Sequence, residues 1–198
     1  NRRFIADLAA YQFNMKNGII RQLNEDGAEF FTNAGEITQK GIEASVLTQI
    51  IRPDQNLVVR SLIFSSNLTF QDYKFKSYKV DDKDYSGNAV TSIPKWIWVN
   101  TLALELPKLF EINIFHNHTS SIPLNDANSF YAKKYHLVQA KLAWTTGFMN
   151  KYQLQLFAGV DNLLNEKYSL GNDINAMGNR FYNAAAERNF YGGIKMMM

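Results

Sequence analysis

The chain has 198 residues, of which 46% are hydrophobic and 20% are charged, and its formal net charge is +3. A charge this small, spread over 18 acidic and 21 basic residues, argues against a nucleic-acid partner. The sequence contains no cysteine, which excludes disulfide bonds and thiolate metal sites within it. Aromatic residues are abundant, with 14 Phe, 10 Tyr and 3 Trp against 4 Pro, and this balance favours strands over helices.

Eight strands of about 10 to 14 residues are predicted, a length that suits tilted strands crossing a bilayer better than the strands of soluble sheets. In chain order they are residues 4–16, 38–51, 57–72, 95–106, 110–118, 135–146, 152–161 and 188–198. No run of the sequence approaches the roughly 18 apolar residues that a membrane-spanning helix needs. The first residues, Asn1 to Phe4, lack the features of a secretory signal, and we expect the chain to be a piece of a longer protein.

The connections between these strands alternate between long and short. Connections of about 16 to 26 residues span 17–37, 73–94, 119–134 and 162–187, whereas connections of about 3 to 5 residues span 52–56, 107–109 and 147–151. Transmembrane barrels have this alternation, with short turns on the periplasmic side and long loops outside the cell. The four long loops are therefore expected to be extracellular, and no secondary structure is predicted in them.

Apolar and polar side chains alternate along the strands. In the seventh predicted strand, Leu154 and Leu156 share one face, while Gln153 and Gln155 share the other. A membrane barrel turns its apolar face to lipid and its polar face to a wet lumen. A soluble sandwich has similar alternation, but strand length, loop lengths and rings suited to the membrane boundary favour the membrane barrel. These boundary rings are Trp96, Trp98, Tyr135 and Tyr152.

Several segments resemble TonB-dependent receptors. The stretch VDNLLNEKY, Val160 to Tyr168, resembles their penultimate strand, where a V-x-N-L-(F/L)-(N/D)-x-x-Y pattern leaves the membrane. The stretch NAAAERNFYGGIK, Asn183 to Lys195, resembles their final strand, although Ala-Glu replaces the usual Pro-Gly before the Arg. Upstream, the stretches NAGE from Asn33, KGIE from Lys40 and IPK from Ile93 resemble earlier parts of the same barrel.

The resemblance implies an all-β fold. Residues 1–198 would be the C-terminal portion of an antiparallel up-and-down transmembrane β-barrel, contributing eight of about 22 strands. The plug domain and the TonB-binding segment of such receptors are not visible in the sequence. On strand count alone, the alternative is a complete eight-stranded outer-membrane barrel with a structural or adhesive role.

The implied function is import across the outer membrane of a Gram-negative bacterium, by a receptor that takes up a scarce ligand such as a ferric siderophore. The implied partners are the TonB complex, through the missing N-terminal region, together with outer-membrane lipid and the barrel-assembly machinery. No cofactor is expected.

Two sets of residues are candidates for these roles. The family's assembly signal resembles polar-x-Gly-x-x-aromatic-x-aromatic, and Tyr191, Gly193, Met196 and Met198 keep its spacing with Met in place of the rings. The candidate ligand-binding side chains are rings and cations of the long loops, which can stack on a flat ligand or attract an anionic one, or can equally pack the loops together. They are Lys133, Tyr168, Arg180, Phe181 and Tyr182.

Other motifs point to neither a metal site nor an enzyme. His116 and His118 lie on one strand face at a spacing that suits a metal, but no third ligand is evident nearby in the sequence. The segment from Asp82 to Gly87 imitates the start of a calcium loop, yet Ile93 occupies the position of its closing Glu. No G-x-S-x-G, H-E-x-x-H or phosphate-binding Gly loop occurs, so no catalytic residue is predicted.

Overall fold

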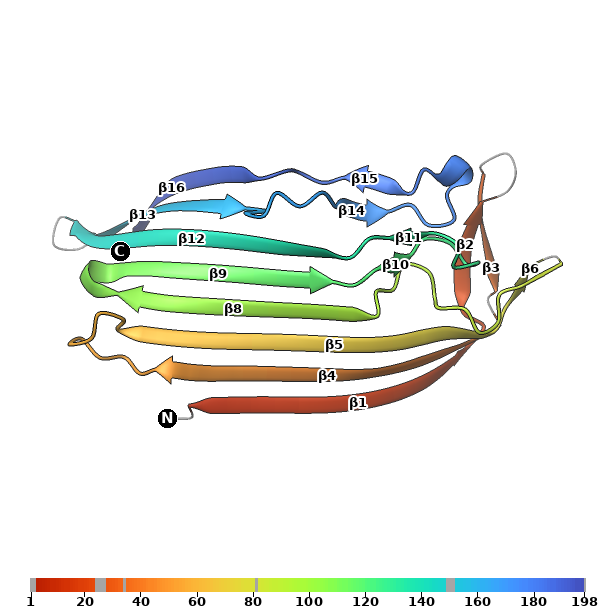
Figure 1. Cartoon of the computed structure of the whole chain (residues 1–198), viewed down its shortest axis with the longest axis horizontal. Helices are drawn as coiled ribbons and strands as arrows, with labels where there is room; N and C mark the ends of the chain where they lie inside the picture. The colour runs from red at the N-terminus through yellow and green to blue at the C-terminus, as the bar shows by residue number, and fades with distance from the viewer. Residues whose placement is uncertain (1–2, 24–27, 34, 81, 149–151, 198) are drawn as a thin grey trace.

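The computed structural model describes residues 3–23, 28–33, 35–80, 82–148 and 152–197, and in this part of the chain eight long strands form one sheet (Figure 1). They are β1 (Phe4–Lys16), β4 (Glu36–Ile51), β5 (Ser61–Ser77), β8 (Trp96–Leu106), β9 (Phe110–Thr119), β12 (Tyr135–Phe148), β13 (Tyr152–Asp161) and β16 (Asn189–Met197). Each pairs antiparallel with the next long strand, so the predicted all-β antiparallel meander is confirmed. Over the same residues, no helix combines the length and hydrophobicity of a membrane span.

The third predicted strand, residues 57–72, is displaced toward the C-terminus at both ends. The strand expected at residue 57 begins at Ser61 and runs to Ser77, so the connection after β4 spans 52–60. A turn accounts for the delay: the backbone N–H of Asp54 donates to the carbonyl of Arg60 at 2.9 Å, and the side chain of Asp54 accepts from the N–H of Asn56. An aspartate that bonds the backbone two residues further on favours a turn over a strand. Val58, although β-branched, is therefore 78% exposed in the turn.

The expectation that the long connections lack secondary structure is also wrong, because each contains a two-stranded ribbon. The ribbons pair β2 (Ile19–Leu23) with β3 (Glu29–Asn33), β6 (Lys79–Val80) with β7 (Lys83–Asp84), β10 (Ile122–Pro123) with β11 (Tyr131–Ala132), and β14 (Ser169–Asn172) with β15 (Tyr182–Ala184). Two 3-10 turns complete the described structure, η1 (Pro107–Leu109) in a short connection and η2 (Met177–Asn179) between β14 and β15.

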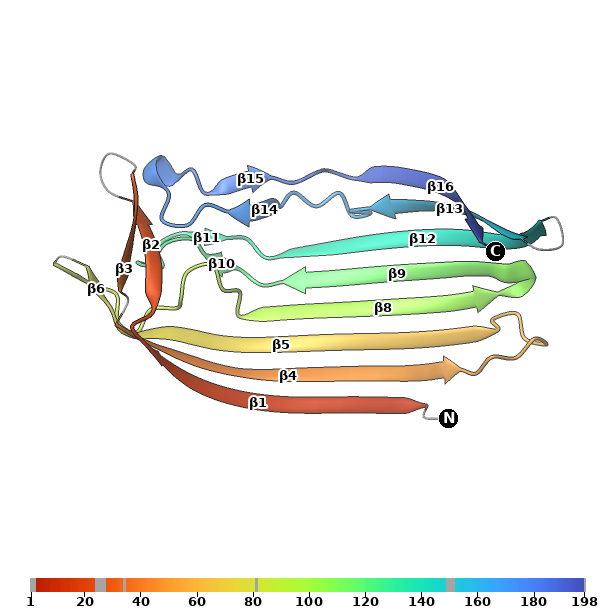
Figure 2. The same ribbon diagram turned by 180° about the vertical axis from the view of Figure 1, so that it is seen from behind.

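All four ribbons lie at one end of the sheet, which we call the long-loop end (Figures 1 and 2). The short connections, the start of β1 and the end of β16 lie at the opposite, short-turn end. In a meander, every second connection lies at the same end of the sheet, and this explains the segregation. The predicted alternation of long and short connections is confirmed.

The register gives the sheet an apolar face and a polar face, since residues opposite one another in paired strands point to the same side. One transverse row reads Phe64, Leu102, Ile114, Ala140, Val160 and Phe190. A row on the other face reads Asp7, Ser45, Asn67, Val99 and Asn117. The apolar face is uncovered within the described structure: Leu8 and Phe190 are each 77% exposed.

Most of the buried hydrophobic side chains of the described residues gather at the long-loop end instead. One cluster consists of Ile37, Phe75 and Tyr78, and a second, which we call the loop core, consists of Ile122, Leu124, Ala132 and Phe181. A single-layer sheet cannot bury an apolar face against itself. An apolar surface of this extent requires lipid or another protein layer as its neighbour.

The sheet is open. Among the described strands, β1 pairs only with β4 and β16 pairs only with β13. A complete eight-stranded barrel would pair β1 with β16, because a spanning sheet must close to satisfy its edge groups. The arrangement is that of a wall segment, and the alternative of a complete small barrel finds no support in it.

Candidate ligand-binding pocket at the long-loop end

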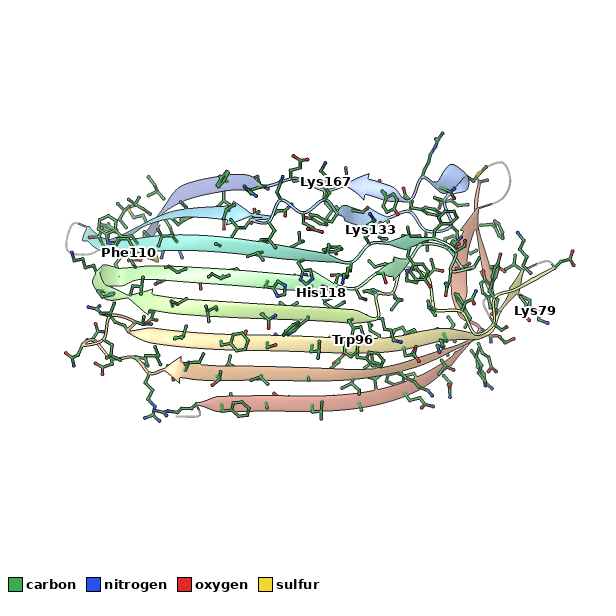
Figure 3. All side chains as sticks on the ribbon, in the orientation of Figure 1. Lys79, Trp96, Phe110, His118, Lys133 and Lys167 are labelled. Carbon is green, nitrogen blue, oxygen red and sulfur yellow. The ribbon has the colours of Figure 1, made fainter. Side chains whose placement is uncertain are left out.

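A cavity of about 450 Å³ opens at the long-loop end, between the start of β12 and the β14–β15 ribbon. Two lysines border it, and Figure 3 labels both, Lys133 just before β12 and Lys167 just before β14. The lining that bears on ligand binding is Lys133, Lys167, Tyr135, Tyr168, Tyr182 and Asn172. Tyr135 has the strand parity of the polar face, so the cavity lies on that side of the sheet.

The segment that leads into the pocket is built around Asn162, whose side chain is 4% exposed and whose φ is +51°. Its amide Nδ2 donates to the carbonyls of Glu166 (2.9 Å) and Ala186 (3.3 Å), and its Oδ1 accepts from the N–H of Glu166 (2.8 Å). Asn tolerates the left-handed region better than other non-glycine residues, and its amide can close a turn on the backbone. The Asn of the VDNLLNEKY motif thus ties the two ends of the loop together.

A second Asn of the motif acts in the same way. The Oδ1 of Asn165 accepts from the N–H of Arg188 at 2.9 Å, immediately before β16. With this exit fixed, Lys167 and Tyr168 emerge directly at the pocket wall. The Tyr168 ring packs on the Tyr135 ring with 5.1 Å between centroids. The motif is therefore a structural turn that presents two of the lining side chains.

The pocket is positively charged and contains an unsatisfied polar atom. Within the described structure, neither Lys133 nor Lys167 has a carboxylate within salt-bridge distance. The Oδ1 atom of Asn172 is buried and has no hydrogen-bond partner among the residues described. Buried polar atoms are nearly always paired, so this oxygen, in a residue that lines the cavity, lacks the partner that such atoms usually have. Anions that also carry aromatic or hydroxyl groups fit such a lining.

The predicted ligand-binding residues separate into three groups. Lys133, Tyr168 and Tyr182 line the cavity together, although more than 30 residues separate the first two in the sequence. Phe181 is 3% exposed in the loop core and packs on the Phe130 ring at 5.3 Å, so its ring is not available to a ligand. Arg180 is exposed but does not border the cavity.

Sequence reasoning missed three of the six lining residues that bear on ligand binding. Lys167 stands inside the VDNLLNEKY motif, next to the predicted Tyr168, so the motif is the sequence signal that could have identified it. Tyr135 was interpreted as a membrane-boundary ring, but it borders the cavity on the polar face. For Asn172, an ordinary loop residue, no sequence signal exists.

Comparison with known proteins defines the family. A profile described as TonB dependent receptor-like, beta-barrel, matches residues 1–163. The chain belongs to this family. No curated protein sequence matches the chain.

Solved structures of siderophore receptors share the fold. The ferric citrate transporter FecA in its unliganded form superposes with a TM-score of 0.75 at 18% identity, covering 98% of this chain and 29% of FecA. BauA, the ferric preacinetobactin receptor from Acinetobacter baumannii, gives 0.71 at 16% identity, covering 98% of this chain and 27% of BauA. The ferric-catecholate import receptor Fiu from E. coli K12 gives 0.69 at 16% identity, covering 98% and 25%. The chain thus spans less than a third of the length of each of these proteins.

The last strand of this TonB-dependent receptor barrel segment shows how the candidate assembly signal is arranged. Met196 lies on the apolar face opposite Leu154 and is 64% exposed, whereas Tyr191 and Gly193 lie on the polar face. The Phe157 ring covers Gly193 so closely that an added Cβ would lie 2.5 Å from the ring, and the Tyr191 ring covers Gly159 in the same way. Met198 lies outside the described residues.

The histidines form a cluster that the sequence did not indicate. His136 on β12 joins His116 and His118 on β9: its Nδ1 lies 3.0 Å from the Nε2 of His116, and its ring stacks on His118 at 4.2 Å. The rings contact one another instead of converging on a common point. In the part of the chain that the structure describes, no group of three metal-binding side chains is arranged to hold an ion.

The calcium-like segment is a turn stabilised by its own side chains. Hydrogen bonds from the side chain and backbone of Ser86 lower the pKa of the Asp84 carboxyl, and Lys79, whose Nζ lies 3.5 Å away, lowers that pKa further. An Asp that accepts from the N–H two residues further on forms a local turn. This carboxylate is therefore occupied by the loop itself.

Proposed function

We propose that this chain is the C-terminal wall and outer loops of an outer-membrane receptor that captures and imports a scarce anionic chelate such as a ferric siderophore. Family membership and the siderophore-receptor fold support this proposal. The single observation that carries it is the pocket in which Lys133, Lys167 and three tyrosine rings meet a buried, unpaired Asn172 oxygen. The family is one of receptors, and the proposal includes no enzymatic step.

The charge and shape of the pocket narrow the ligand class. Two ammonium groups near one cavity raise the local concentration of anions, and tyrosine rings supply flat apolar contacts together with a hydroxyl. Ferric chelates built on catecholates or hydroxycarboxylates are anionic and rich in oxygen atoms. FecA is described as a ferric citrate transporter and Fiu as a ferric-catecholate receptor. We take ferric citrate and a ferric catecholate as the two test ligands.

The apolar face supports a location in the outer membrane of a Gram-negative bacterium. Eight adjacent strands present apolar rows on one side, and in lipid only helices and closed barrels satisfy the backbone. In this proposal the long-loop end is extracellular, the polar face lines the lumen, and strands elsewhere in the protein complete the barrel. A plug, a TonB complex that powers import, and the barrel-assembly machinery are the further partners proposed.

The proposal predicts that the two pocket lysines control affinity. In the purified full-length protein, K133Q/K167Q is expected to weaken binding of whichever test ligand the wild type binds by at least about tenfold. A tenfold loss corresponds to about 1.4 kcal/mol of binding free energy. Isothermal titration at two salt concentrations measures this, and the loss should shrink at high salt because screening weakens exposed charges.

The matched control is K108Q/K134Q, which removes the same charge from exposed lysines outside the pocket lining. Its affinity is expected to stay within about twofold of wild type, a difference of only a few tenths of a kcal/mol. An equal loss in both double variants would assign the effect to overall charge. No loss in either, or a wild type that binds neither ligand, would refute the proposed site.

A further inference from the structure

Three long loops meet at one buried carboxylate, that of Asp126 in the loop between β10 and β11, which is 2% exposed. Its Oδ2 accepts from the Tyr78 hydroxyl at 3.0 Å and from Nδ2 of Asn175 at 3.1 Å, and its Oδ1 accepts from the Thr91 hydroxyl. Tyr78 and Thr91 belong to the connection after β5, and Asn175 to the connection after β13. One side chain thus bonds two loops other than its own.

Backbone contacts reinforce the same junction. The N–H of Asp126 donates to Oδ1 of Asn175 at 3.0 Å, and Nδ2 of Asn88 donates to the carbonyl of Asp126 at 2.8 Å. Asn128, two residues further on, both accepts from the N–H of Ala89 (2.8 Å) and donates to the Ala89 carbonyl (3.0 Å). Networks of this kind in a poorly hydrated site strengthen each member.

The junction is connected to the pocket without bordering it. Asn175 donates its N–H to the carbonyl of Leu124 at 2.9 Å, and Leu124 packs in the loop core with Ala132 and Phe181. Ala132 and Tyr182, which follows Phe181, both line the pocket. The relative position of these two lining residues therefore depends on how the loops are held together.

We propose that Asp126 is a positioning residue that joins the connections after β5, β9 and β13 into one rigid unit and thereby fixes the ligand pocket. Its part in affinity rests on the proposed function, whereas the joining of the loops does not. Removing the carboxylate takes away the shared acceptor of the Tyr78 hydroxyl, the Thr91 hydroxyl and the Asn175 amide, and so breaks the three bonds that join the loops at this side chain. The loops are then expected to separate while the strands below them stay paired.

Hydrogen–deuterium exchange on the full-length protein tests the joining of the loops. In D126A, the amides of Ala89 and Asn175 are expected to exchange at least about tenfold faster, although both lie in loops other than that of Asp126, while amides in β5 and β13 keep their wild-type rates. D126N, which retains one acceptor oxygen, should be intermediate. The control is D173N, which changes an exposed carboxylate in the same set of loops.

Faster exchange confined to the loop of Asp126 itself would overturn the proposal. If D126A does not fold, N175A provides the second test, with faster exchange expected in the connection after β13 and not in the connection after β5.

Ligand affinity is the measurement that distinguishes a positioning role from a purely structural one. Folded D126A should bind the test ligand of the wild type at least about tenfold more weakly, and unchanged affinity with loosened loops would refute the positioning role. A wild type that binds neither ligand would refute the proposed function, and the exchange result alone would then decide whether Asp126 joins the loops.

Discussion

On the polar face, two aromatic rings lie against glycines of the neighbouring strand, Tyr191 over Gly159 and Phe157 over Gly193. These glycines are required by close approach, because any Cβ would meet a ring. The two contacts interlock β13 with β16, the strands that carry the family motifs. Gly193 of the final motif is thus explained by packing of β16 against β13.

G159A should therefore destabilise the folded protein by about 1–3 kcal/mol, as overpacking does. G147A is the matched control, because nothing lies within 4 Å of the Cβ it would add. Urea unfolding of the full-length protein in lipid vesicles measures both. Y191A should remove most of the penalty of G159A in the double variant, and equal losses for G159A and G147A would contradict the interlock.

A substitution at Met196 tests whether the apolar face contacts lipid. It projects beside Leu154 on that face and is 64% exposed, so M196D would place a carboxylate in lipid. The heat-modifiable, membrane-inserted fraction of the full-length protein should fall sharply. K195D, one residue away on the polar face, should insert nearly as wild type does. Normal insertion of M196D would show that this end of β16 is neither in lipid nor part of the assembly signal.

At the scale of elements, the loop between β13 and β16 is held at its ends by Asn162 and Asn165, while its middle carries the β14–β15 ribbon and Asn175. Deleting residues 171–179 removes the middle and leaves the paired strands intact. We expect the barrel to assemble and ligand uptake to fall at least several-fold, since exposed loops tolerate deletion. Radiolabelled-chelate uptake is scored beside surface abundance. Normal uptake at normal abundance would assign capture to other loops, and loss of the barrel would show the segment to be structural.

The sequence predicted the strands well because alternation over ten or more residues is imposed by two different solvents on the two faces. β1 and β13 have the predicted bounds, and all eight long strands were found. The ribbons were missed because pairings of two to five residues leave no periodic signal. Asp126 was missed because its partners lie 35 to 49 residues away along the chain.

The candidate site was also only partly predictable from the sequence. Rings and cations in long loops were singled out as a class, and three of them line the pocket, but neighbouring residues of an extended segment point to opposite sides. Phe181 is therefore buried in the loop core while Tyr182 lines the pocket. Only the fold of the loop distinguishes the two, and the pattern of residue types along the loop does not indicate that fold.

At the scale of the whole molecule, the structure is an open wall with an apolar side, a polar side and one elaborated end (Figure 1). It corresponds to between 25% and 29% of the length of the receptors that it resembles. In the proposed receptor, strands from the rest of the barrel would pair with its two edges, and ligand capture and passage would be properties of the complete protein.

The most direct test is energy-dependent uptake by the full-length protein in iron-starved Gram-negative cells. Accumulation of ⁵⁵Fe from ferric citrate or a ferric catecholate should require the protein, should cease in cells that lack TonB, and should fall in K133Q/K167Q but not in K108Q/K134Q. Uptake that continues without TonB, or that is indifferent to the pocket lysines at normal surface abundance, would contradict the account.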